Sequence, residues 1–222
     1  MEYEVTGFGA YPERFAHLVD LIRDRGARSV ISAASHNGGE PFTLAMHLVD
    51  QGLTDVRIVA HDGRPDRYPV LQRAEYLRTE IGVDFAMGRL PERFREFFVP
   101  AEDPDRLGIR PDVRALVDVR PPCLLPWQGV EPAEVYMLRN LWIHIHPPER
   151  AELARRIRDV LPSDGVVAVR TAHHDEIGAM APRLGDRVYG RFLASASRVR
   201  AWRPAKDVLY AAAHANATGW AN

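Results

Sequence analysis

A glycine-containing loop and an acid downstream of it are the residues of this sequence best suited to binding a ligand. The loop runs from residue 33 to residue 40, and its Gly38 and Gly39 lack the Cβ that would keep a ligand away from the backbone. Asp62 lies further along the chain, where a carboxylate can accept hydrogen bonds from two ribose hydroxyls. The pattern indicates a nucleoside cofactor, although an ordinary turn beside a solvated acid leaves the same pattern.

The loop and Asp62 lie where strands of a parallel sheet are expected to end. Residues 28–33 form an apolar run before the loop, residues 40–51 have a helical pattern after it, and residues 56–60 form a second apolar run before Asp62. This order of strand, loop, helix and strand is the unit of a parallel sheet, and ligands bind beyond the carboxyl ends of such strands.

The remaining sequence continues the alternation of helices and strands. Further helices are expected over residues 12–25, 71–81, 92–98 and 148–161, and further strands over residues 113–117, 134–138 and 166–169. Two later apolar segments, residues 188–194 and 208–213, predict an antiparallel hairpin at the sheet edge. The expected fold class is α/β, with a mostly parallel twisted sheet in a single domain spanning residues 1–222.

Composition argues against several classes of partner. The net charge is −1, with 29 Lys and Arg against 30 Asp and Glu, so there is no basic field for nucleic acid. Cys123 is the single cysteine, which excludes an internal disulfide and a cysteine-based zinc cluster and fits a reducing compartment. The acidic N-terminus lacks the features of a signal peptide, and no apolar run is long enough to span a membrane. We therefore expect a cytoplasmic protein with no nucleic-acid or membrane partner.

The loop sequence resembles a known family. Ser32-Ala-Ala-Ser-His-Asn-Gly-Gly-Glu-Pro-Phe-Thr-Leu-Ala-Met46 is similar to the S-A-G-C-S-T-G-E-E-P-Y-S-L-A-M signature of CheR-type methyltransferases, which methylate glutamates of chemotaxis receptors. Ala60-His-Asp62 and Arg139-Asn-Leu-Trp-Ile-His-Ile145 resemble that family's A-T-D and R-N-V-L-I-Y-F, and residues 6–15 resemble its T-x-F-F-R-x-P-x-H-F. The resemblance extends to Val169 and does not include the helical domain that precedes this core in chemotaxis enzymes.

The resemblance implies a Rossmann-like class I methyltransferase fold and S-adenosylmethionine (AdoMet) as the cofactor. It places Asp62 on the ribose and Asn140 near the sulfonium. The full set of expected cofactor-binding residues is Ala34, Gly38, Glu40, Asp62, Asn140 and Leu141. Structural alternatives remain open, because Glu40 could serve only the helix dipole and Asn140 could serve only as a helix cap.

Departures from the family pattern gather on the substrate side. Ala34 stands in place of the first motif glycine, Gly9 in place of a phenylalanine and Ala10 in place of an arginine that could pair with a carboxylate. His144 replaces the tyrosine beside the methyl group, where it could act as a general base or be an interior histidine.

These departures favour an AdoMet-dependent methyltransferase that acts on a small-molecule acceptor, mainly by proximity and orientation. One alternative is a protein carboxyl (glutamate) methyltransferase of CheR type, and a second is a non-catalytic AdoMet-binding or scaffold protein. A metal site built from His144, His146, His173 and His174 is not expected, because no carboxylate spacing completes a ligand set. The oligomeric state is left open, with a homodimer as one option.

Overall fold

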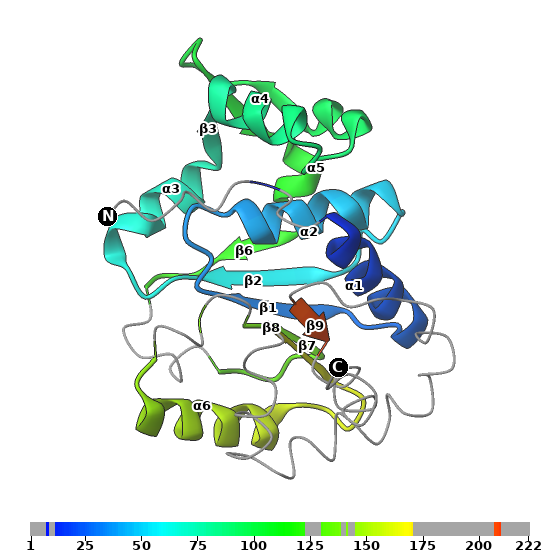
Figure 1. The fold of residues 1–222 in the computed structure, drawn as a ribbon, viewed down its shortest axis with the longest axis vertical. Helices are drawn as coiled ribbons and strands as arrows, with labels where there is room; N and C mark the ends of the chain where they lie inside the picture. The colour runs from blue at the N-terminus through cyan, green and yellow to red at the C-terminus, as the bar shows by residue number, and fades with distance from the viewer. Residues whose placement is uncertain are drawn as a thin grey trace. The chain divides into compact units, whose positions relative to one another are not determined.

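The computed structural model describes residue 8 and residues 12–122, 130–138, 141, 145–170 and 207–209 (Figure 1). Two units emerge from the contacts within the chain. The first comprises residues 1–28 and 34–123, and the second comprises residues 29–33 and 124–222. The expected single domain stays a prediction.

The first unit contains the two longest helices of its part of the chain and a pair of parallel strands. The helices are α1 (Pro12–Arg25) and α2 (Gly39–Asp50), and the strands are β2 (Arg57–His61) and β6 (Val117–Val119). Ile58 pairs with Val117 in parallel register. The helical spacing of Leu18, Val19 and Ile22 gives α1 an apolar face, and all three side chains are buried. α2 is buried from Gly39 to Leu48, which fits a helix covered on several sides.

The chain between β2 and β6 holds a small antiparallel sheet. Its strands β3 (Glu75–Leu77), β4 (Phe98–Pro100) and β5 (Arg106–Ile109) follow the order β3-β5-β4. Short helices connect them to each other and to the parallel strands. These are η1 (Pro65–Arg67), α3 (Tyr68–Arg73), α4 (Arg78–Ala86), η2 (Glu92–Phe97) and α5 (Pro111–Arg114).

Two expected elements in this region are wrong. The single helix expected over residues 71–81 is divided, because Ala74 adopts a left-handed conformation (φ 51°) that ends α3 and leads into β3. The strand expected over residues 113–117 begins only at Val117, because Pro111 starts a helical turn and its fixed φ suits that position. The piece expected over residues 92–98 is a 3₁₀ helix that ends at Phe97.

The second unit contains the remaining strands of the main sheet and one helix. β1 (Ser29–Ala33), β7 (Val135–Met137) and β8 (Val166–Arg170) pair in parallel, and β9 (Asp207–Leu209) pairs antiparallel with β8. α6 (Pro147–Val160) precedes β8 and has Pro in its first turn. Glu134, just before β7, accepts hydrogen bonds from the Ser29 backbone N–H (2.9 Å) and hydroxyl (3.0 Å), which fixes the register of β1 against β7.

Along the main sheet the strands follow the order β6-β2-β1-β7-β8-β9. The predicted α/β class, with a mostly parallel sheet and an antiparallel C-terminal edge strand, is confirmed. The other expected strand of the hairpin, residues 188–194, lies outside the described residues.

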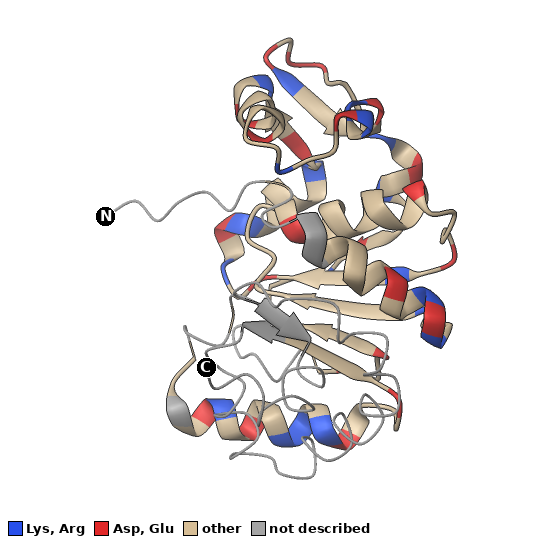
Figure 2. Cartoon of the chain, turned by 45° about the vertical axis from the view of Figure 1, so that its right-hand side comes forward, with Lys and Arg blue, Asp and Glu red and all other residues tan. Residues whose placement is uncertain are grey.

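Charged residues of both signs are interspersed along the described helices and turns (Figure 2). Many form surface ion pairs, such as Arg156 with Glu152 on α6 (2.7 Å). A two-pronged pair joins Arg93 of η2 to Asp50 at the end of α2, with both N–O distances 2.9 Å. Within the part of the chain that the structure describes, no helix has the length and apolar character needed to cross a membrane.

His47 is a buried histidine in the aromatic contact between α1, α2 and η2. Its ring stacks on Phe15 at 6.0 Å and meets Phe94 edge-on at 4.7 Å. Its Nε2 has no hydrogen-bond partner, and the side chain is 6% exposed. Burial lowers the pKa of His47 from 6.5 to about 4, with Asp50 opposing and Arg93 adding to the shift. The native state therefore holds this imidazole neutral.

We expect His47 to make the protein sensitive to mild acid. Because its folded pKa lies below its unfolded pKa, its contribution is present above pH 6.5 and is lost as pH falls toward about 4. Going from about pH 7.5 to about pH 5 should cost about 2 kcal/mol through this residue. Urea denaturation of wild type and His47→Leu across this range should show a difference in unfolding free energy that shrinks or reverses with acid. A difference independent of pH would contradict the assignment.

Candidate functional site

The loop before α2 has an unusual backbone. Ala34, His36 and Gly38 have φ angles of 57°, 50° and 93°, all in the left-handed region. Gly38 is required there for a second reason, since a Cβ on it would lie 2.7 Å from the Tyr76 hydroxyl and 2.8 Å from the Phe42 ring. The loop is thus tightly enclosed by side chains from α2 and β3.

Hydrogen bonds within the loop fix this conformation. The Gly38 N–H donates to the Ser35 carbonyl (2.7 Å), and the Gly39 N–H donates to the Asn37 side-chain oxygen (3.1 Å). The Ser35 N–H donates to the carbonyl of His61, the last residue of β2 (3.1 Å). The last bond ties the loop directly to the carboxyl end of a parallel strand, the edge at which such sheets bind ligands.

Asp62 organises the same edge. Its Oδ2 accepts the His36 N–H (2.8 Å), its Oδ1 accepts the Arg64 N–H (2.9 Å), and the residue is 8% exposed. A carboxylate has about four acceptor positions, so two remain for a ligand. Asp62 is therefore a buried acid rather than a solvated one, and its contact with the ribose stays a prediction. Asp62 holds together the loop and the turn that follows β2.

Glu40 lies in the first turn of α2 and is also 8% exposed. An acid that only complements the helix dipole can do so from the surface, where it keeps its hydration. Burying a carboxylate costs free energy unless polar groups compensate it. The role of Glu40 in cofactor binding stays a prediction.

His36 was not among the residues expected from the sequence. Its backbone N–H contacts Asp62, and its side chain is half-buried with a buried Nδ1 that has no hydrogen-bond partner. Burial lowers its pKa, as do Arg67 and Arg64, while Asp62 and Asn37 oppose the shift. The available signal was its place inside the matched motif, where the family signature has serine. A neutral imidazole here offers a ligand one further hydrogen-bonding group.

The other expected site residues lie in the second unit. Leu141 is described as a half-exposed turn residue. Asn140 and His144 lie outside the described residues, as do Gly9 and Ala10, so their roles remain predictions. The structure therefore brings together Ala34, Gly38, Glu40 and Asp62, all within the first unit.

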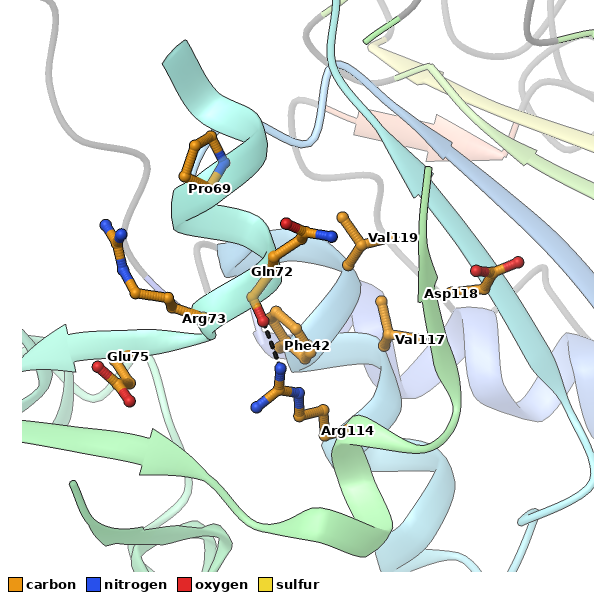
Figure 3. A pocket seen from close by; sticks show the side chains of 9 residues that line it. All are labelled: Phe42, Pro69, Gln72, Arg73, Glu75, Arg114, Val117, Asp118 and Val119. Atoms are coloured by element: carbon orange, nitrogen blue, oxygen red, sulfur yellow. Dashed lines mark hydrogen bonds between the residues drawn. The ribbon is translucent and has the colours of Figure 1, made fainter. Parts of the chain in front are cut away.

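A separate hollow of about 670 Å³ lies between α3, α5 and β6 (Figure 3). Charged side chains of both signs surround it, including Arg73, Glu75 and Asp118, and Arg114 donates a hydrogen bond to the Gln72 carbonyl. Its lining includes Phe42 but none of Gly38, Glu40 or Asp62. We do not assign it as the cofactor site, because the residues with suitable chemistry lie elsewhere.

Comparison with known proteins identifies the family. The family described as "CheR methyltransferase, SAM binding domain" matches residues 6–176. The chain belongs to this family. The predicted CheR-type resemblance is confirmed, and the family's description as a SAM-binding domain agrees with the predicted AdoMet cofactor.

Curated relatives share this core at low identity. A chemotaxis protein methyltransferase of Vibrio parahaemolyticus is 27% identical over 155 residues, covering 67% of this chain and 54% of the relative. The probable biofilm formation methyltransferase WspC of Pseudomonas aeruginosa is 28% identical over 181 residues, covering 75% and 41%. The chain thus spans about half the length of the curated relatives it matches, or less.

Solved structures give weaker matches. An O-methyltransferase from Bacillus cereus in complex with SAH is 14% identical with a TM-score of 0.44, covering 88% of this chain and 72% of that one. The CcbJ methyltransferase from Streptomyces caelestis is 16% identical with a TM-score of 0.43, covering 76% and 56%. Among the described residues, no group of His, Cys, Asp and Glu could hold a metal ion.

The CheR-type loop should gain stability when its first motif glycine is restored. An L-residue pays about 1–2 kcal/mol for a left-handed conformation, and Ala34 has φ 57°. After allowance for the greater freedom of glycine in the unfolded chain, Ala34→Gly should stabilise by about 0.5–1 kcal/mol. Ala86→Gly, on the exposed face of α4, is the matched control and should destabilise by a similar amount. Thermal denaturation of both variants checks this, and a loss of stability in Ala34→Gly would refute it.

Replacing Asp62 should weaken cofactor binding strongly. Asp62→Ala removes the charge-assisted bonds predicted to the ribose and leaves the His36 and Arg64 N–H groups without their acceptor. We expect S-adenosylhomocysteine affinity to fall by about 1.5–3 kcal/mol, measured by calorimetry. Asp66→Asn, which loses only the ion pairs of an exposed carboxylate with Arg64 and Arg67, should bind as wild type does. Unchanged affinity in Asp62→Ala would show that Asp62 does not bind the ribose.

Proposed function

We propose that this chain is the catalytic core of an AdoMet-dependent methyltransferase that esterifies a carboxylate, a glutamate side chain, on another protein. The observation that carries the proposal is the loop of residues 34–38, held at a strand end by buried Asp62, in a chain of the CheR family. The curated relatives named as chemotaxis methyltransferases support the acceptor class. Cofactor contacts are assigned to Ala34, Gly38, Glu40 and Asp62, with Asn140 and Leu141 as further proposed contacts.

Methylation of a carboxylate requires no proton transfer by the protein. A glutamate with a pKa near about 4.3 is already ionised at neutral pH, so its oxygen can attack without giving up a proton. That oxygen forms a bond to the AdoMet methyl carbon while the methyl–sulfur bond breaks, and the products are a methyl ester and neutral S-adenosylhomocysteine. The protein then contributes mainly by holding donor and acceptor in line. His144 is not needed as a base for this acceptor.

The small-molecule alternative would place different demands on the same site. A hydroxyl or amine acceptor loses a proton as it attacks, and a base at His144 would be worth about 10²- to 10⁴-fold. The replacement of the motif arginine by Ala10 is the feature that favours this alternative, since a cation there could pair with a substrate carboxylate. The two acceptors differ in the stability of their products to alkali.

Alkaline release of transferred label separates the two. Wild type is incubated with AdoMet carrying a radiolabelled methyl group and a protein extract of its host, and macromolecules are then separated from small molecules. We expect label in protein that mild alkali releases as volatile methanol, because carboxyl methyl esters hydrolyse whereas N-methyl and ether groups do not. Asp62→Ala should transfer at least tenfold less, in line with its lost binding energy. Alkali-stable label confined to small molecules would contradict the proposal.

A further inference from the structure

One contact joins the small antiparallel sheet to the cofactor loop. The Tyr76 hydroxyl, from the middle of β3, donates a hydrogen bond to the Asn37 carbonyl at 2.7 Å. Tyr76 is 4% exposed, and burial raises the pKa of its hydroxyl, so the group stays a neutral donor. The Asn37 carbonyl lies directly before Gly38, the left-handed residue that caps α2.

The Tyr76 hydroxyl also accounts for the shape of the loop. A Cβ on Gly38 would come within 2.7 Å of that oxygen, so the Tyr76 hydroxyl leaves no room for a side chain at residue 38. The backbone N–H groups of Ser35, His36, Gly38 and Gly39 bond within the loop, to the His61 carbonyl or to Asp62. The Tyr76 hydroxyl, which comes from β3, donates in addition to a backbone carbonyl of the same loop.

The far side of Tyr76 is fixed in turn by the N-terminal motif. The Phe8 ring meets the Tyr76 ring edge-on at 4.6 Å and the Phe98 ring of β4 at 5.4 Å. The Phe8 N–H donates to buried Asp84 of α4 (2.8 Å), whose other oxygen pairs with Arg89 (2.9 Å). Phe8 thus packs directly on Tyr76, and Asp84 and Phe98 in turn hold Phe8 in place.

We infer that Tyr76 is a positioning residue for the cofactor, through which the small antiparallel sheet sets the conformation of the AdoMet-binding loop. Tyr76 touches the loop backbone and acts through it. The inference rests on the proposed function only in taking the loop as the cofactor site. It adds a role for the small sheet, which otherwise contributes nothing to the described cofactor residues.

The test compares phenylalanine substitutions at two buried tyrosines, each of which removes a hydroxyl that donates to a backbone carbonyl. Tyr136 is 1% exposed and donates to the Glu131 carbonyl, before the start of β7 and so at the opposite end of that strand from the ligand edge. Tyr76→Phe and Tyr136→Phe should each lower the melting temperature modestly and by similar amounts. Only Tyr76→Phe should weaken S-adenosylhomocysteine binding in calorimetry, by roughly two- to tenfold. Equal affinities for wild type and Tyr76→Phe, or equal weakening in both variants, would overturn the inference.

Hydrogen exchange supplies a readout that does not need cofactor affinity. In the ligand-free protein, Tyr76→Phe should speed exchange in the peptide covering residues 34–39 at least twofold, and Tyr136→Phe should not. In wild type, S-adenosylhomocysteine should slow exchange in both that peptide and residues 75–77, whereas protection confined to the loop would count against the inference. If wild type fails to bind S-adenosylhomocysteine, the proposed function fails, and the ligand-free comparison still decides whether Tyr76 holds the loop.

Discussion

The left-handed backbone of the loop before α2 is the constraint on which the candidate site depends. Ala34, His36 and Gly38 alternate with ordinary residues in this conformation, and only Gly38 adopts it without strain. Such a loop persists only where its surroundings hold it, and here Asp62, the His61 carbonyl and Tyr76 do so. Each of these groups bonds to backbone, so the loop tolerates changes in side chain more readily than changes in its supports.

The chain segment between β2 and β6 also supports the loop. A plain crossover helix would cover the sheet but would not bring a buried hydroxyl to the Asn37 carbonyl. The small antiparallel sheet does so through Tyr76 of β3, whose ring packs edge-on against Phe8 and whose hydroxyl bonds to the loop. Aromatic rings pack edge-on around it, as Phe85 and Phe98 do, and burial raises the pKa of Asp84 while Arg89 and the Phe8 N–H oppose that shift. Side-chain packing between β2 and β6 therefore helps to fix the backbone geometry of the loop.

Helices and strands with a clear hydrophobic periodicity could be predicted from the sequence. Elements that depend on contacts between distant residues could not. The apolar spacing of α1 and the strand, loop and helix around Gly38 emerged from local pattern, as did Asp62 at the strand end. The small sheet pairs Tyr76 with Leu107 and Phe98 with Ile109, strands too short to carry a pattern of their own. Ala74 is an ordinary helix former whose left-handed conformation comes from tertiary structure. The roles of His36 and Tyr76 likewise depend on partners far away in sequence.

The charge distribution bears on how such a domain could recognise an acidic acceptor. With a net charge of −1 and both signs interspersed over the described surface, there is no broad positive field to draw glutamates toward the protein (Figure 2). Recognition of a carboxylate must then come from short-range hydrogen bonds and ion pairs near the methyl group, together with the positive sulfonium of AdoMet itself. A sulfonium attracts an approaching carboxylate and is neutralised as the methyl transfers, so part of the selectivity belongs to the cofactor. Under the proposed carboxyl methylation, a site that relies on its cofactor in this way tolerates Ala10 in place of the motif arginine.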